Sequence, residues 1–203
     1  PAVGLHAIDV GDGRPPALLH TLPIPGLNAG ALAGDMRLHG TRLYIGAGLG
    51  IHVVDVANPQ AMALITSLPP GPTINDVDII GDRLFAATIQ NGVTVYDVAQ
   101  GDTPVLVDVM KTKNGTTAAA VTPLGLLVVD YGEGLARHPM ADGVLADAPD
   151  ARHVATGVVQ SVAHVAGGQT MATMAGGRFV SLTPGSAGWD AVSLDLPADV
   201  QAS

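Results

Sequence analysis

The chain has 203 residues, of which 47% are hydrophobic and 13% are charged, a composition that excludes an intrinsically disordered protein. Its 9 basic and 18 acidic residues give a net charge of −9, which argues against nucleic acid and anionic membrane surfaces as partners. There is no cysteine, which excludes disulfides and thiolate metal sites, and no apolar run reaches about 18 residues, so we expect no transmembrane helix.

One unit of roughly 42 residues recurs along the chain, and the N-terminal residues 4–10 match only its second half. The two clearest copies are TRLYIGAGLGIHVVDV at 41–56 and DRLFAATIQNGVTVYDV at 82–98. A third copy covers 124–139, and a more degenerate fourth covers 168–183. With the partial copy at the start, the chain therefore holds about five units of one repeat.

Each full unit consists of four short apolar runs that are bounded by Gly, Pro, Asn and Asp, which is the signature of strands and turns. The unit boundaries lie at approximately 1–30, 31–72, 73–115, 116–158 and 159–203. The predicted strands, in chain order, are 4–10 and 17–24; 35–40, 42–47, 50–56 and 62–69; 76–81, 83–88, 92–98 and 104–111; 118–123, 125–130, 134–140 and 151–158; 162–167, 169–174, 177–183 and 189–196.

The runs predict an all-β chain. Residues 93–98 (VTVYDV) alternate with period 2, as a strand with one buried face does, and Asn91-Gly92 before them is a hairpin signal. Four antiparallel strands every 40 to 45 residues or so is the period of a β-propeller blade. We therefore predict a single domain over 1–203, a β-propeller of four-stranded antiparallel blades, with a pair of β-sandwiches as the alternative.

The best-preserved part of the unit resembles the LVIVD-type repeat family. Residues 50–59 (GIHVVDVANP) match its pattern best and residues 92–104 nearly as well, whereas His138-Pro139 and Leu182-Thr183 depart from it. The resemblance implies a β-propeller of secreted or cell-surface proteins from bacteria or archaea. The family carries no known shared catalytic residues, so the resemblance implies a scaffold or binding role.

The phase of the repeat bears on ring closure. The chain opens at the third strand of one unit and ends after the fourth strand of another, so one blade has two strands within the sequence. Either the missing pair follows Ser203 and completes a five-bladed ring, or whole blades are absent from the sequence. We favour the second alternative, in which the chain is part of a longer protein with a ring of about six to eight blades.

Four polar residues near the start of the innermost strands are the candidate site. Asp35 and Asp76 recur at one position of the unit, and Asn75 and Asp78 lie close by. The innermost strands of a propeller line its central channel, so these side chains can converge at the channel mouth. Carboxylate and amide oxygens there would bind a basic ligand or a cation, for which Ca²⁺ is the candidate.

The ring of acids at that position is incomplete, because units three and four carry Ala118 and Val162 there. No other cofactor and no catalytic residue is predicted.

Two other recurring sets have structural interpretations. Asp9, Asp55 and Asp97 recur at one position and could be ligands, but an Asp before a turn more often bonds its own backbone. His6 and His52 also share one position, which indicates packing on a strand surface.

Two function classes follow. The first is a non-catalytic structural or binding module of a secreted, periplasmic or cell-surface bacterial protein, whose partner is another protein or the remainder of a larger polypeptide. The second is a hydrolytic or lactonase-like propeller enzyme with a metal in the channel. The second class needs several acids, Asn or His on innermost strands of different units, and only Asp35 and Asp76 meet that requirement.

Overall fold

The computed structural model describes most of the chain and shows an all-β protein. The described residues are 4–11, 13–26, 33–48, 50–68, 71–122, 125–131, 134–141, 144–146, 148–153, 159–165, 169–174, 178–185 and 188–195. Within these ranges the secondary structure consists of strands and turns, without a helix. None of the described segments is therefore a helix long and apolar enough to cross a membrane.

The described strands form six antiparallel sheets, of which one is a small hairpin within unit four. We number the other five 1 to 5 in chain order; sheet 1 has two strands and sheets 2 to 5 have four each. Sheet 1 holds β1 (Leu5–Asp9) and β2 (Ala17–Leu22); sheet 2 holds β3 (Ala33–His39), β4 (Arg42–Ala47), β5 (Gly50–Asp55) and β6 (Ala63–Ser67); sheet 3 holds β7 (Ile74–Ile80), β8 (Arg83–Thr88), β9 (Gly92–Asp97) and β10 (Val105–Met110); sheet 4 holds β11 (Thr116–Thr122), β12 (Gly125–Asp130), β13 (Gly134–His138) and β16 (Ala151–His153); and sheet 5 holds β17 (Val159–Val165), β18 (Gln169–Met174), β19 (Arg178–Gly185) and β20 (Gly188–Asp195).

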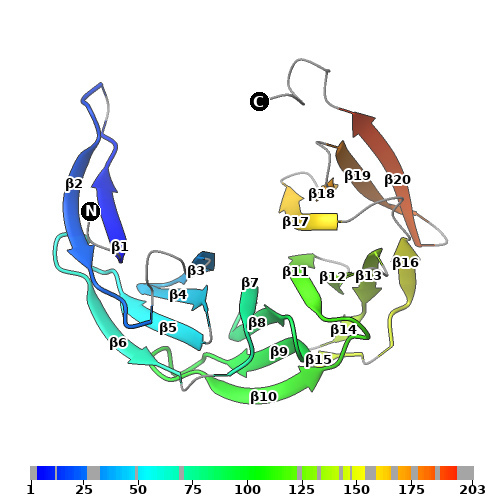
Figure 1. Cartoon of the computed structure of the whole chain (residues 1–203), viewed down its shortest axis with the longest axis horizontal. Coiled ribbons are helices and arrows are strands. Elements are labelled where there is room, and N and C mark those ends of the chain that lie inside the picture. The colour runs from blue at the N-terminus through cyan, green and yellow to red at the C-terminus, as the bar shows by residue number, and fades with distance from the viewer. Residues whose placement is uncertain are drawn as a thin grey trace.

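The sheets follow one another along an arc (Figure 1). The first strands of sheets 2 to 5, which are β3, β7, β11 and β17, lie on the concave side and contact one another in sequence. We call them the inner strands. The predicted four-stranded antiparallel units are confirmed, and the described strands form an open arc without ring closure.

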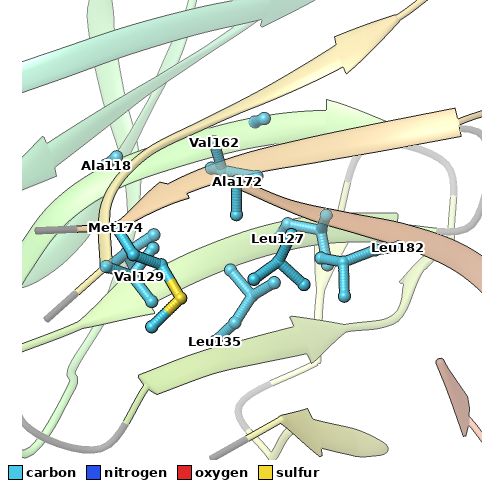
Figure 2. Packing of buried hydrophobic residues seen from close by; sticks show 11 residues of the cluster. Ala118, Leu127, Val129, Leu135, Val162, Ala172, Met174 and Leu182 are labelled. Carbon is cyan, nitrogen blue, oxygen red and sulfur yellow. The ribbon is translucent and has the colours of Figure 1, made fainter. Parts of the chain in front are cut away.

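Apolar side chains fill the space between successive sheets. Figure 2 shows the layer between sheets 4 and 5, where Leu127, Val129 and Leu135 face Val162 and Leu182. Similar clusters lie between sheets 1 and 2, 2 and 3, and 3 and 4. Because burial of aliphatic surface stabilises each layer, a chain with 3% aromatic residues can build its core from sheet-on-sheet contacts.

A β-bulge lies near the start of each inner strand, and the pairing after it corrects one sequence assignment. The pairing register shifts between Ile74 and Asp76 in β7 and between Val159 and Ser161 in β17. Each bulge inserts one extra residue at the same place of its unit. The paired ends of β17 and β18 are separated by three residues and those of β7 and β8 by two, so spacing counted from the connection places β17 one residue out. Ser161, and not Val162, therefore lies at the position equivalent to Asp76.

Unit four departs from the predicted strand pattern. Its last strand is described over Ala151–His153, and residues 154–158 of the predicted strand 151–158 lie outside the described ranges. A small hairpin of β14 (Met140–Ala141) and β15 (Val144–Leu145), which the sequence did not predict, precedes that strand. The departure coincides with the place where the repeat sequence degenerates at His138-Pro139.

The recurring aspartates shape turns, as the structural interpretation predicted. Each carboxylate Oδ1 accepts a hydrogen bond from the backbone N–H two residues later, at 2.9 Å in all three cases. The residues are Asp9, Asp55 and Asp97. This geometry stabilises the turn that follows the third strand of the unit.

The recurring histidines bind hydroxyl groups on the adjacent strand. His6 Nδ1 lies 3.0 Å from Thr21 Oγ1 in sheet 1, and His52 Nδ1 lies 2.8 Å from Ser67 Oγ in sheet 2. The prediction of strand-surface packing is confirmed. The match also shows that β1 and β2 correspond to β5 and β6, the third and fourth strands of a unit.

Sheets 2 and 3 approach each other closely at Gly46. A Cβ atom at this glycine would lie 2.6 Å from Ile74 Cγ2 and 2.7 Å from Val77 Cγ1, both on β7. Those distances are shorter than any van der Waals contact, so a side chain here would force the two sheets apart.

We expect Gly46→Val to lower the free energy of unfolding by about 1–3 kcal/mol, because overpacking strains a close-packed layer. Urea denaturation followed by circular dichroism measures the change. Ala63→Val on the exposed face of β6 is the matched control and should change stability by no more than about 0.5 kcal/mol. Equal stability of the two variants would contradict the close approach.

Candidate functional site

A cavity of about 450 Å³ lies where the inner strands of sheets 2 to 5 begin. Its volume falls within the range of roughly 300–1,000 Å³ that is usual for small-molecule sites. All four inner strands contribute to its wall. The lining residues are Asp35, Arg37, Asn75, Asp76, Thr117, Ala118, Gln160, Ser161, Val162 and Ala163.

The β-bulges place polar side chains in this wall. The extra residue of the bulge is Asn75 in β7, Thr117 in β11 and Gln160 in β17. All three line the cavity, and the Asn75 amide also donates a hydrogen bond to the Thr116 carbonyl at 3.2 Å. A bulge changes the direction of a side chain relative to a regular strand. The same bulge therefore contributes a polar side chain to the cavity in each of three neighbouring units.

An ion-pair network links sheets 2, 3 and 4 beside the cavity. The Arg37 guanidinium binds Asp35 through Nη1 and donates from Nε to Asp78 Oδ1 at 2.9 Å. Asp78 Oδ2 in turn accepts the backbone N–H of Val121 at 2.7 Å. Burial alone would lower the pKa of Arg37, but the hydrogen bonds that it donates to both aspartates raise it, so the guanidinium stays charged.

Asp76 is the buried carboxyl of the site, with a relative exposure of 9%. Its Oδ2 accepts the backbone N–H of Ala119 on β11 at 3.0 Å. Burial raises the pKa of Asp76 to about 7, the Ala119 N–H opposes that rise, and the nearby Asp35 carboxyl adds to it. Asp76 therefore holds a proton until close to neutral pH.

Three of the four residues predicted for the site line the cavity, and one does not. Asp35, Asn75 and Asp76 form part of its wall, whereas Asp78 lies beside it with both oxygens engaged by Arg37 and the Val121 N–H. In the described part of the chain, no group of three or more His, Asp or Glu residues is placed to hold a metal ion.

Sequence reasoning missed four polar lining residues: Arg37, Thr117, Gln160 and Ser161. Arg37 could have been found, because it occupies the position of Asp78 one unit earlier. Residues of opposite charge at equivalent positions of adjacent units are candidates for an ion pair. Gln160 and Ser161 were missed because the connection between β17 and β18 is one residue longer than that between β7 and β8, which put the sequence alignment one residue out. Ala118 was correctly assigned as a gap in the ring of acids.

The site offers binding chemistry: two carboxyl groups close together, a guanidinium held by ion pairs, two amide side chains and two hydroxyls. Its carboxylates outnumber its guanidinium when all are ionised, so its field favours a cation. No family model and no curated protein matches the chain. The LVIVD-type resemblance and the secreted or cell-surface location that it implies therefore stay predictions.

The raised pKa of Asp76 predicts a specific dependence of stability on pH. Between pH 4 and 7 or so, the folded protein keeps a proton that the unfolded chain, with a carboxyl pKa near 3.9, has already released. The free energy of unfolding therefore falls as pH rises through this window, on the order of 2–4 kcal/mol at about 1.4 kcal/mol per pKa unit.

The variant Asp76→Asn should lose this component, because its amide keeps an oxygen for the Ala119 N–H and does not ionise. Denaturation curves of both proteins from pH 4 to 8 measure the difference. Asp97→Asn is the control, and its effect on the pH dependence of stability should have the opposite sign, since the Ala99 N–H and Arg83 lower the pKa of Asp97. Parallel pH profiles for wild type and Asp76→Asn would show that Asp76 is not a protonated buried carboxyl.

Proposed function

We propose that the chain forms the greater part of a β-propeller that acts as a non-catalytic binding module, with its ligand in the cavity at the start of the inner strands. The repeated four-stranded sheets, their arc and the inner position of β3, β7, β11 and β17 support the propeller assignment. The single observation that carries the binding role is the polar wall built by residues from all four inner strands.

The wall is preorganised by bonds between sheets. The Arg37–Asp78 pair joins sheet 2 to sheet 3, and Asp76 and Asp78 both accept backbone N–H groups of sheet 4. A ligand therefore meets side chains whose positions are already determined by the fold. Preorganisation improves affinity because less conformational freedom is lost on binding.

The chemistry of the wall favours a small organic cation. An ammonium or guanidinium group would lie against the Asp35–Asp76 pair, and the Asn75 and Gln160 amides would bind its polar substituents. Arg37 already neutralises part of the charge of Asp35. A compact divalent ion such as Ca²⁺, which prefers several fully charged oxygens, suits this wall less well.

We expect agmatine, which carries a guanidinium and an amine, to shift the backbone amide NMR signals of Asn75, Thr117 and Gln160 in the ¹⁵N-labelled protein. Binding should be weaker at pH 5 than at pH 8, because protonated Asp76 no longer attracts the cation. Asp76→Asn at pH 8 should weaken binding about tenfold, equivalent to about 1.4 kcal/mol.

Three controls accompany this titration. Glutarate, an anion of similar length, should leave the same signals unchanged, and Asp82→Asn, an exposed site, should bind agmatine like the wild type. Calcium chloride tests the Ca²⁺ alternative. The proposal fails if neither agmatine nor calcium shifts the cavity signals, or if the protein hydrolyses a lactone in a calcium-dependent way.

A further inference from the structure

Sheet 1 has the third and fourth strands of a repeat unit and, in the described part of the chain, no inner pair. The His6–Thr21 and His52–Ser67 contacts are equivalent, and so are the turns after Asp9 and Asp55. By this correspondence β1 occupies the place of β5, and its edge away from β2 is the edge that a second strand covers in sheets 2 to 5.

The face of β3 that is turned toward sheet 1 is exposed where its counterparts are buried. Met36 has a relative exposure of 44%, whereas the equivalent Val77, Ala119 and Val162 have 0%, 0% and 6%. Leu38, on the same face, has 59%. In sheets 3 to 5 the inner strands of the preceding sheet cover this position, so the exposed apolar side chains mark a place where such a strand pair is expected.

We propose that this place binds a β-hairpin of the repeat's own inner-pair type, supplied by a polypeptide segment other than the described strands. One strand of this closing hairpin pairs antiparallel with the edge of β1, and the other lies across Met36 and Leu38 of β3. The edge of β1 supplies backbone hydrogen bonds, and the two apolar side chains supply buried area, as in recognition by strand addition.

The charge at the edge of β1 specifies one residue of the hairpin. In sheets 2 and 3 an arginine at the start of the second strand pairs with the aspartate at the end of the third: Arg42 with Asp55 at 3.1 Å, and Arg83 with Asp97 at 2.6 Å. Those pairs also face each other in the strand register. Asp9 is the equivalent carboxylate in sheet 1, so the hairpin should place an arginine opposite it.

The backbone of β3 specifies a second feature. The N–H of Val121 on β11 is bound by the Asp78 carboxylate of the preceding inner strand. Leu38 occupies the same position on β3 as Val121 on β11. The inner strand of the closing hairpin should therefore carry a carboxylate at the place of Asp78, directed at the Leu38 N–H.

A second copy of the chain does not fit this place as well as a separate hairpin. Each inner pair of sheets 2 to 5 is already hydrogen-bonded to the third strand of its own sheet. Two copies could only join their β1 edges to each other, which would leave Met36 uncovered by an inner strand. The structure therefore favours, at this place, a segment whose two strands are not already paired within another sheet.

The chain contains a suitable probe, because residues 74–88 are the inner pair of sheet 3 and include both Asp78 and Arg83. A fluorescein-labelled peptide of this sequence should bind the full chain, as measured by fluorescence polarisation. Met36→Asp should weaken binding about tenfold or more, because it puts a charge into the buried contact. It should leave the stability of the free chain unchanged, since Met36 is exposed there.

A charge exchange separates the proposed register from non-specific adhesion. Peptide carrying R83E should bind the wild-type chain poorly and bind Asp9→Arg at least about five times better, because the ion pair is restored with its polarity reversed. Circular dichroism checks that both chain variants are folded. The proposal would be overturned if the peptide did not bind or if both peptides bound equally. It would also be overturned if light scattering showed a dimer of the chain that loses affinity with Asp9→Arg.

Discussion

Each inner strand pairs with its own sheet along one edge, and the N–H groups along its other edge need partners of their own. In sheet 4 those partners are carboxylates of the preceding inner strand: Asp76 binds the Ala119 N–H, and Asp78 binds the Val121 N–H. An aspartate side chain thus supplies, between two sheets, the hydrogen-bond acceptor that a neighbouring strand supplies within a sheet. Together these two bonds hold β11 against β7.

The apolar layers lie between successive sheets, and the cavity lies where the inner strands of the same sheets begin. Between sheets 2 and 3 the layer closes to the point where only glycine fits at Gly46, and between sheets 4 and 5 it is filled by small and branched aliphatic side chains. Toward the concave side the same strands stay far enough apart to leave the polar cavity. Asp76 belongs to both systems, since it holds β11 in place and also lines the cavity. Its burial costs stability when it ionises, which is a cost typical of a functional site.

The repeat predicted most of the fold because strand length, turn residues and period are local properties of the sequence. It also predicted Asp35, Asn75 and Asp76 as neighbours, since equivalent positions of adjacent units must lie side by side. It did not predict Gln160 and Ser161, because one extra residue between β17 and β18 displaces that unit in the sequence alignment without changing its strand pattern. The partners of the aspartates were equally hidden, since backbone N–H groups are present at every residue except proline and only the three-dimensional spacing selects Ala119 and Val121.

The exposed apolar face of β3 and the two-stranded sheet 1 have one cause: the described repeat starts at the third strand of a unit. Met36 shares its position with Val77 and Ala119, and it differs from them in what lies opposite, not in its own chemistry. A repeat protein buries each unit against the next, so a unit with no inner strand pair beside it keeps an exposed apolar face. The cavity lies on the inner strands of sheets 2 to 5 and therefore does not require that edge to be covered.

Native-state hydrogen exchange at the Ala119 and Val121 amides tests most directly whether carboxylates join the inner strands. Both amides lie on the edge of sheet 4 that is not paired within the sheet. If Asp76 and Asp78 bind them, they should exchange as slowly as the amides of the paired strand β12 and become faster at Val121 in Asp78→Ala. Fast exchange of both amides in the wild-type protein, at the rate of an open strand edge, would contradict the account.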